Sequence, residues 1–165
     1  MNVILTRINS ETDIVLLASL ADEIWREHYL SILTKDQIDY MIDKFQSADA
    51  MTHQIINQGY EYYFITVCGE EIGYTGICKD VDKLFLSKLY IKKEFRGNRY
   101  ASEVFKQLQQ ICVNRRLKAI WLTVNRYNEE SVAIYKKMGF KVIRTRVADI
   151  GQGYVMDDFI MEFVL

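Results

Sequence analysis

A basic, glycine-containing loop lies between a β-rich segment and a long amphipathic segment near the middle of the chain. The loop covers residues 96–101, and Lys92, Lys93 and Arg99 add positive charge to it. A loop that runs from a strand into a helix exposes unpaired backbone N–H groups at the positive end of the helix dipole. This arrangement suits a pyrophosphate group, so we interpret the loop as a phosphate cradle. A basic loop that serves only solubility is the alternative interpretation.

A second group of polar residues follows a short apolar segment in the last third of the chain. Asn125 precedes Asn128, Ser131 and Tyr135, which recur at three- and four-residue spacing and so share one face of a helix. The amides could donate hydrogen bonds to the backbone of a ligand, and the phenol has a proton to give. The alternative assigns Asn128 to a helix N-cap, Ser131 to solvent and Tyr135 to the core.

Other nucleophiles and metal ligands are sparse. The two histidines, His28 and His53, are far apart in sequence, and helical packing explains them as well as ligation does. The three cysteines form no C-x-x-C pair, so we expect core thiols rather than disulfides or a zinc cluster. We therefore expect neither histidine-led catalysis nor a metal. The cysteines are Cys68, Cys78 and Cys112.

Charge is segregated along the chain. The formal net charge is −1, yet residues 83–147 hold sixteen basic and four acidic side chains, whereas residues 1–58 hold four basic and nine acidic ones. The middle block therefore favours an anionic ligand, and the flanking blocks favour a cationic one. The alternative is a mixed, solvated surface, because blocks in sequence need not be patches in space.

Length and composition favour one soluble domain. Half of the 165 residues are apolar and 26% are charged, which excludes a disordered or collagen-like chain. No proline or Gly/Ser linker divides the sequence, so we predict a single domain over residues 1–165. No apolar run has the length of a membrane span, and the first residues lack the layout of a signal peptide. We expect a cytoplasmic protein without membrane contact.

Hydrophobic periodicity predicts the element order β-α-α-α-β-β-β-α-β-α-β-β. This order predicts an α/β (α+β) fold, with helices on both faces of a mixed, mostly antiparallel sheet of about seven strands. Ser10 with Asp13, and Thr34 with Gln37, are typical of helix starts. The expected strands cover residues 2–8, 60–68, 72–78, 83–91, 119–124, 140–147 and 154–164. The expected helices start near Ser10, Thr34, Ala48, Ala101 and Asn128, and the fourth carries Arg115 and Arg116 in its last turn.

The two polar groups together resemble the GNAT N-acetyltransferase superfamily, which binds acetyl-coenzyme A. Its strand-to-helix signature is Gln/Arg-x-x-Gly-x-Gly/Ala, and residues 96–101 match it with Arg99 in place of the usual glycine. A side chain there is unstrained only at negative φ, and its guanidinium could instead pair with a phosphate. Residues 122–128 and 133–140 match the superfamily's downstream motif without a gap.

The resemblance implies direct attack by an amine on the thioester, without a covalent acyl-enzyme. The strands at 87–91 and 120–124 would splay apart, so that the pantetheine arm pairs with the free edge of β-strand residues 89–91. The backbone N–H near Leu89 would polarise the thioester carbonyl, and Tyr135 would protonate the departing thiolate. The residues that the resemblance assigns to the cofactor are Leu89, Tyr90, Ile91, Arg96, Gly97, Asn98, Arg99, Tyr100, Ala101, Ser102, Asn125, Asn128, Ser131 and Tyr135.

Three segments, 35–47, 85–91 and 155–158, resemble bacterial Pai-type polyamine acetyltransferases. This narrower resemblance implies a small polycation such as spermidine as the acceptor. Glu27, Asp157 and Asp158 are the acidic residues expected to border the acceptor, and the general base among them, acting directly or through a water, is left open.

Three other functions remain as alternatives. The chain could be a noncatalytic acyl-coenzyme A-binding regulatory module, or it could acetylate a protein or another small-molecule amine. Nucleic-acid binding is disfavoured, because the net charge is near zero and the basic run is not interleaved with aromatic residues outside the cradle. The sequence does not decide between a monomer and a homodimer.

Overall fold

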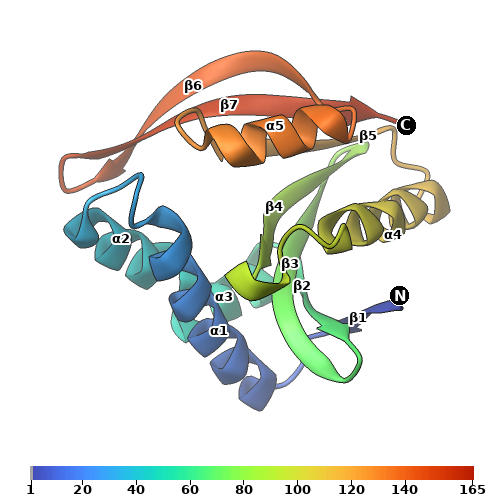
Figure 1. Ribbon diagram of the computed structural model, residues 1–165, viewed down its shortest axis with the longest axis horizontal. Helices are drawn as coiled ribbons and strands as arrows, with labels where there is room; N and C mark the ends of the chain where they lie inside the picture. Colours follow the sequence, from blue (N-terminus) through green and yellow to red (C-terminus); the bar gives the residue numbers. More distant parts are fainter. Residues whose placement is uncertain (1) are drawn as a thin grey trace.

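A seven-stranded sheet in the order β1-β2-β3-β4-β5-β7-β6 organises the molecule, as Figure 1 shows. The computed structural model describes residues 2–165. Every neighbouring pair of strands is antiparallel except β4 and β5, which run parallel. The strands are β1 (Val3–Arg7), β2 (Tyr60–Val67), β3 (Glu70–Asp80), β4 (Lys83–Ile91), β5 (Ala119–Asn125), β6 (Lys141–Gly151) and β7 (Tyr154–Val164). The predicted fold class and element order are confirmed.

The helices begin where local capping chemistry predicts. The helices are α1 (Glu11–Tyr29), α2 (Lys35–Met41), α3 (Ala48–Asn57), α4 (Tyr100–Asn114) and α5 (Glu129–Lys137). The side chains of Ser10, Thr34 and Asn128 accept hydrogen bonds from the backbone N–H three residues ahead, at 3.1, 3.2 and 3.2 Å. Each cap satisfies a donor that the first helical turn leaves free. A π-helical segment, Ile42–Gln46, extends α2.

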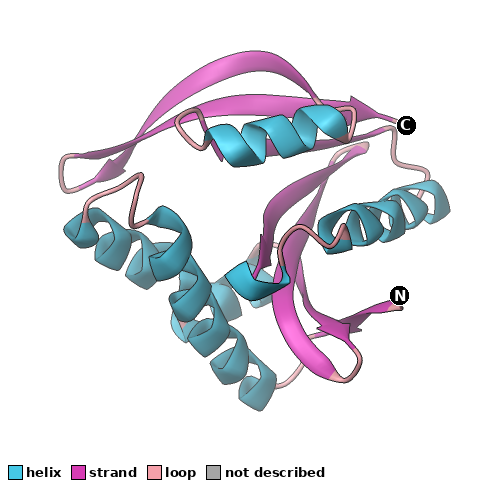
Figure 2. Cartoon of the chain, in the orientation of Figure 1, coloured by secondary structure: helices cyan, strands magenta, loops and turns pink. Residues whose placement is uncertain are grey.

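Two hydrophobic clusters hold the helices against opposite faces of the sheet (Figure 2). One cluster joins α4 and α5 to the sheet through Phe105, Leu108 and Val132. The other joins α1, α2 and α3 to the opposite face through Leu17, Ile38 and Met51. A ligand placed between the two groups of helices must therefore pass through the sheet itself.

The sheet opens between β4 and β5. Their parallel pairing covers only Lys83 to Phe85 against Ala119 to Trp121. Beyond that point β5 stays paired with β7 up to Asn125, and β4 stays paired with β3 up to Ile91. The β5-facing edge of residues 86–91 therefore has no strand partner within residues 2–165, as the resemblance implied.

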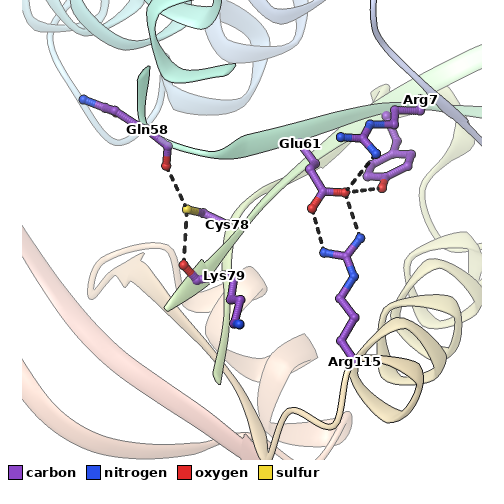
Figure 3. Close-up of polar contacts among 7 residues, drawn as sticks. Arg7, Gln58, Glu61, Cys78, Lys79 and Arg115 are labelled. Atoms are coloured by element: carbon purple, nitrogen blue, oxygen red, sulfur yellow. Dashed lines mark hydrogen bonds and ion pairs between the residues drawn. The ribbon is translucent and has the colours of Figure 1, made fainter. Parts of the chain in front are cut away.

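Two predictions about charged and sulfur-containing side chains are wrong. Helix α4 ends at Asn114, so its last turn contains no basic residue, and Arg115 instead forms an ion pair with Glu61 of β2 at 2.6 Å (Figure 3). Only Cys112 is a core thiol. Cys68 is exposed in the turn between β2 and β3, and the half-buried Cys78 sulfur lies 3.3 Å from the Gln58 carbonyl oxygen.

Candidate active site

A cavity of about 1110 Å³ lies where β4 and β5 diverge. Its wall combines the start of α4 and the inner face of α5 with side chains from α1 and α3 on the opposite side of the sheet. The opening between the strands therefore connects two chemically different halves, which we call the α4–α5 half and the α1–α3 half.

The loop before α4 has the geometry of an anion cradle. The Arg96 Nε atom donates to the Ile91 carbonyl oxygen at 2.9 Å, which fixes the loop to the end of β4. Gly97 adopts φ +80°, a conformation that glycine reaches without strain. Arg99 is the N-cap of α4, but its side chain makes no capping hydrogen bond. The residues at the start of α4, Arg99 to Ser102, line the cavity, so the N-terminal end of the helix lies at its wall.

Arg99 does not meet the conformational expectation. Its φ is +63°, in the left-handed region, rather than negative. A non-glycine residue pays roughly 1–2 kcal/mol for this conformation. The backbone therefore keeps the shape that a glycine would give it, and the guanidinium borders the cavity.

The asparagines after β5 are largely used within the chain. The Asn125 side-chain oxygen accepts from the Tyr127 N–H at 2.9 Å. Asn128 is buried, its oxygen caps α5, and its amide nitrogen lies 2.8 Å from the His28 Nε2 atom of α1. The capping interpretation of Asn128 is therefore correct, and its amide links two helices. Both asparagines and Ser131 still line the cavity.

Three tyrosine hydroxyls gather at the opening between the strands. Tyr135 packs edge-on against Phe140, with ring centroids 5.5 Å apart, and its hydroxyl has no hydrogen-bond partner within residues 2–165. Burial raises the pKa of Tyr135, so the phenol keeps its proton at neutral pH. Tyr29 and Tyr90 share a hydrogen bond of 2.9 Å, and burial raises the pKa of Tyr29 to about 12.

Of the three acidic candidates, only Asp158 lines the cavity. It is 2% exposed, and burial raises the pKa of its carboxyl to about 6, an effect that Arg146 opposes and Asp157 reinforces. Asp157 forms an ion pair with Arg126 at 2.7 Å, and the exposed Glu27 borders a separate cavity of about 390 Å³. A carboxyl that titrates near 6 is mostly ionised at pH 7 and can receive a proton.

The acidic residues before position 59 do not contribute to this cavity. Of the acidic residues described, only Glu130 and Asp158 belong to its wall. The cationic side chains at its cradle end include Arg96, Arg99 and Lys106. The cations of the cavity wall are thus consistent with the predicted preference of the middle block for an anion. Of the acidic residues predicted to border the acceptor, only Asp158 belongs to the wall.

Sequence reasoning missed Lys88, Tyr29 and Gln54, all of which line the cavity. Tyr29 and Gln54 occupy ordinary inward-facing helical positions, so their periodicity predicts only burial. Lys88 belongs to a strand in which buried and less buried side chains otherwise alternate. From sequence alone, a single lysine in such a strand predicts a solvent-exposed side chain. The informative signal was its neighbourhood, because a lysine within an apolar strand needs a specific reason to be there.

Within residues 2–165, no three His, Cys, Asp or Glu side chains are grouped so that they could hold a metal ion. None of the helices in the same range combines the length and apolar character that crossing a membrane requires.

Comparisons with known proteins agree with this geometry. The family described as "Acetyltransferase (GNAT) domain" matches residues 29–155. A spermidine N(1)-acetyltransferase of Thermoplasma acidophilum is 23% identical over 141 residues, covering 83% of this chain and 88% of that protein. A Bacillus subtilis protein named as a candidate ribosomal protein bS18-alanine N-acetyltransferase is 27% identical over 94 residues. That match covers 56% of this chain and 62% of the Bacillus protein.

Solved structures match the whole length of the chain. One of them is the PaiA N-acetyltransferase of Thermoplasma acidophilum in complex with coenzyme A, with a TM-score of 0.82 and 22% identity, covering 100% of both chains. At this identity the likeness concerns the fold. Together with the family match, it confirms the resemblance inferred from the motifs.

Proposed function

The chain belongs to the GNAT acetyltransferase family, and from that premise we propose that residues 1–165 form one N-acetyltransferase domain that transfers the acetyl group of acetyl-coenzyme A to a primary amine. One observation carries the proposal. The free edge of β4, the start of α4, the Tyr135 phenol and the Asp158 carboxyl all border one cavity that runs through the sheet.

The residues present fit acetyl-coenzyme A. The N-terminal end of α4 lines the cavity, where a helix start suits a pyrophosphate, and Arg96 and Arg99 add charge beside it. The open edge at Leu89 to Ile91 suits an amide-containing arm that adds to the sheet like a strand. The bound thioester supplies an acetyl carbonyl that an amine can attack.

The chain's own residues would act on protons and on the carbonyl. Asp158 accepts a proton from the acceptor ammonium, directly or through a water, because only the neutral amine has a lone pair. The N–H of Leu89 donates to the carbonyl oxygen as negative charge develops there, an effect worth a few kcal/mol. Tyr135 donates its proton to the departing sulfur. One C–N bond would form and one C–S bond would break. The attacking nitrogen would lose its second proton to solvent as the amide forms, and afterwards Asp158 would release its proton to solvent and Tyr135 would regain one from it.

A polyamine such as spermidine is the acceptor that we propose. The support is the spermidine N(1)-acetyltransferase name of one relative, the Pai-type resemblance of three segments, and the placement of Asp158 where a cationic amine can meet a carboxylate. A protein amine or another small amine is the second candidate, since the relative from Bacillus is named for an alanine of a ribosomal protein.

A thiol-release assay tests this function. Acetyl-coenzyme A is held at saturation, and the amines are spermidine, spermine, phenylethylamine and a peptide with an N-terminal alanine. Amine-dependent release of coenzyme A with the acetylated amine found by mass spectrometry supports the proposal. Tight binding of acetyl-coenzyme A without transfer to any amine would instead favour a noncatalytic acyl-coenzyme A-binding module.

A further inference from the structure

Lys88 points into the α1–α3 half of the cavity because β4 carries a bulge. Leu86 pairs with Ile77 of β3, but Lys88 pairs with Gly76, so Ser87 is an extra residue in the strand. A bulge of one residue moves the following side chains to the other face of the sheet. Leu86 therefore belongs to the cluster under α4, whereas the Lys88 amine reaches α3.

The amine of Lys88 lies in a neutral, aromatic setting. Lys88 Nζ is 3.2 Å from Gln54 Oε1, contacts the Tyr62 hydroxyl, and lies 5.4 and 4.9 Å from the ring centroids of Tyr60 and Tyr62. Gly76 makes this possible, because a Cβ there would lie 2.8 Å from the Tyr62 ring. The aromatic faces and the amide oxygen offset part of the cost of burying a cation.

No carboxylate compensates the charge of Lys88. The residue is 7% exposed and takes part in no ion pair within residues 2–165. Burial alone lowers the pKa of its amine to about 7. The titratable groups that face it are the Tyr60 and Tyr62 phenols of β2, and burial raises the pKa of each. Of these three groups, Lys88 is therefore the one whose pKa lies closest to neutral pH.

Lys88 shares the cavity with Asp158, which we propose receives the reacting amine. The charged side chain that β6 contributes to the cavity wall is Arg146, opposite Asp158 of β7 in the strand pairing. A second ammonium group near Lys88 would meet a like charge in a poorly solvated place, with no carboxylate in contact to offset it.

We propose that Lys88 is a specificity-determining residue that keeps a second ammonium group out of the part of the cavity between α3 and β4. The proposal rests on the acetyltransferase function above and refines its acceptor class. An acceptor with an ammonium at its far end therefore enters this part only after Lys88 has lost its proton, whereas an acceptor with a neutral or anionic far end can fill the space while Lys88 is charged.

Three acceptors of one chain length isolate the effect. Pentylamine, 1,5-diaminopentane and 5-aminopentanoate carry a methyl, an ammonium and a carboxylate at the far end. Their dissociation constants are measured by calorimetry on the protein saturated with coenzyme A, at pH 6.0 and pH 8.5. Pentylamine is the reference, because the state of Asp158 affects the reacting end of all three acceptors alike.

At pH 6.0, one unit below its pKa, Lys88 is mostly protonated and must lose its proton before the diamine binds. In the wild type, the diamine should therefore bind about tenfold more weakly than pentylamine at this pH. The difference should fall below about twofold at pH 8.5 by the same reasoning.

Lys88→Met should abolish the difference at pH 6.0 and weaken binding of 5-aminopentanoate. Gln54 and Tyr62 retain their mutual hydrogen bond of 2.5 Å in that variant. Lys118→Met, outside the cavity wall, should behave as the wild type.

The wild-type pH comparison needs no variant, so poor folding of Lys88→Met would not remove the test. A diamine that binds as well as pentylamine at pH 6.0, a ratio independent of pH, or no measurable binding of any acceptor overturns the proposal. Thiol release measured on the same samples separates the two proposals. Selective binding without transfer would refute the acetyltransferase function alone, and transfer without the pH-dependent selectivity would refute the role of Lys88 alone.

Discussion

Tyr135 is the residue whose role is most directly testable. Its hydroxyl has no partner within residues 2–165, and burial keeps the phenol protonated at neutral pH. Tyr135→Phe preserves the ring that packs on Phe140. We expect kcat to fall about 10-fold to 1,000-fold, the scale for loss of a positioned proton donor, with little change in coenzyme affinity. Single-turnover kinetics, which measure the chemical step, provide the check; an unchanged rate would make Tyr135 a packing residue.

Substitution of Arg99 by glycine should affect stability and ligand affinity in opposite directions. Arg99→Gly removes the strain of φ +63°, so we expect stability to rise by about 0.5–1 kcal/mol in urea unfolding. The same change removes a cation from the cradle and should weaken coenzyme A binding. Arg116→Gly is the matched control, because Arg116 also has a positive φ, +56°, and does not line the cavity. It should stabilise similarly and leave affinity unchanged. Equal affinity in both variants would remove Arg99 from the phosphate site.

At this scale the sequence predicts residue types better than their partners. Tyr135, Asp158 and the cradle loop except Asn98 border the cavity, because motif spacing fixes where a side chain leaves its element. The Asn98 amide instead donates to the Phe95 and Arg96 carbonyl oxygens within the loop. Asn128 and Asp157 have the predicted functional groups, but within the chain Asn128 forms a hydrogen bond with His28, and Asp157 forms an ion pair with Arg126. The direction of Lys88 was not predicted, because one extra residue in β4 moves the side chains that follow it to the other face of the sheet.

Among elements, the link between α1 and α5 depends on a neutral histidine. The His28 Nε2 atom lies 2.8 Å from the Asn128 amide nitrogen, so the ring must accept that hydrogen bond. Burial, and then the charge of Arg96, lower the pKa of His28 to about 4 against an opposing effect of Glu130. The native state therefore binds fewer protons than the unfolded chain between pH 4 and 6.5. Stability from this group is complete above pH 6.5 and is lost as the pH falls toward 4.

We therefore expect the wild type to lose about 2 kcal/mol more stability than His28→Gln between pH 7 and pH 5, from the difference between the native and unfolded pKa. Urea unfolding at the two pH values measures this difference. Asp158, whose pKa is raised, acts with the opposite sign in both proteins and cancels in the comparison. Parallel pH profiles would mean that the imidazole is not held neutral in the folded protein.

The boundaries of elements were predictable to the extent that local chemistry sets them. Ser10, Thr34 and Asn128 cap helices at the predicted positions, because a side chain that satisfies the first turn acts within three residues. The end of α4 was misplaced, because Arg116 adopts a left-handed conformation, φ +56°, without the glycine that usually marks such a helix end in a sequence. Strand order depends on contacts between residues far apart in sequence and was not predicted, and the opening between β4 and β5 was implied only by the family resemblance.

At the scale of the whole molecule, the opening between β4 and β5 costs free energy of folding. Two strands in the middle of the sheet leave backbone groups without strand partners beyond Phe85 and Trp121, and unsatisfied backbone groups are destabilising when they are shielded from water. The cradle end of the wall also gathers the cationic side chains of Arg96 and Arg99 without an acidic partner in the described ion pairs. A ligand that pairs with the β4 edge and brings phosphates to the cradle relieves both effects at once.

Acetyl-coenzyme A should therefore stabilise the fold far beyond its contacts with one loop. A ligand at 100 times its dissociation constant adds about 2.7 kcal/mol when it binds only the folded state. For a chain of this size, that corresponds to a rise in Tm of about 5–10 °C. Differential scanning calorimetry with and without the ligand measures it.

Two substitutions decide where this stabilisation originates. Arg96→Ala removes a cation from the cradle together with the hydrogen bond to the Ile91 carbonyl, so we expect the ligand-induced rise in Tm to shrink at a fixed ligand concentration. Lys118→Ala removes a charge that is 76% exposed and pairs with Asp82 away from the cavity, so the rise should persist. If both variants lose the same part of the rise, the ligand responds to diffuse positive charge. If only Arg96→Ala loses it, the anion is held at the junction of β4 and α4, which is also the place where the sheet opens.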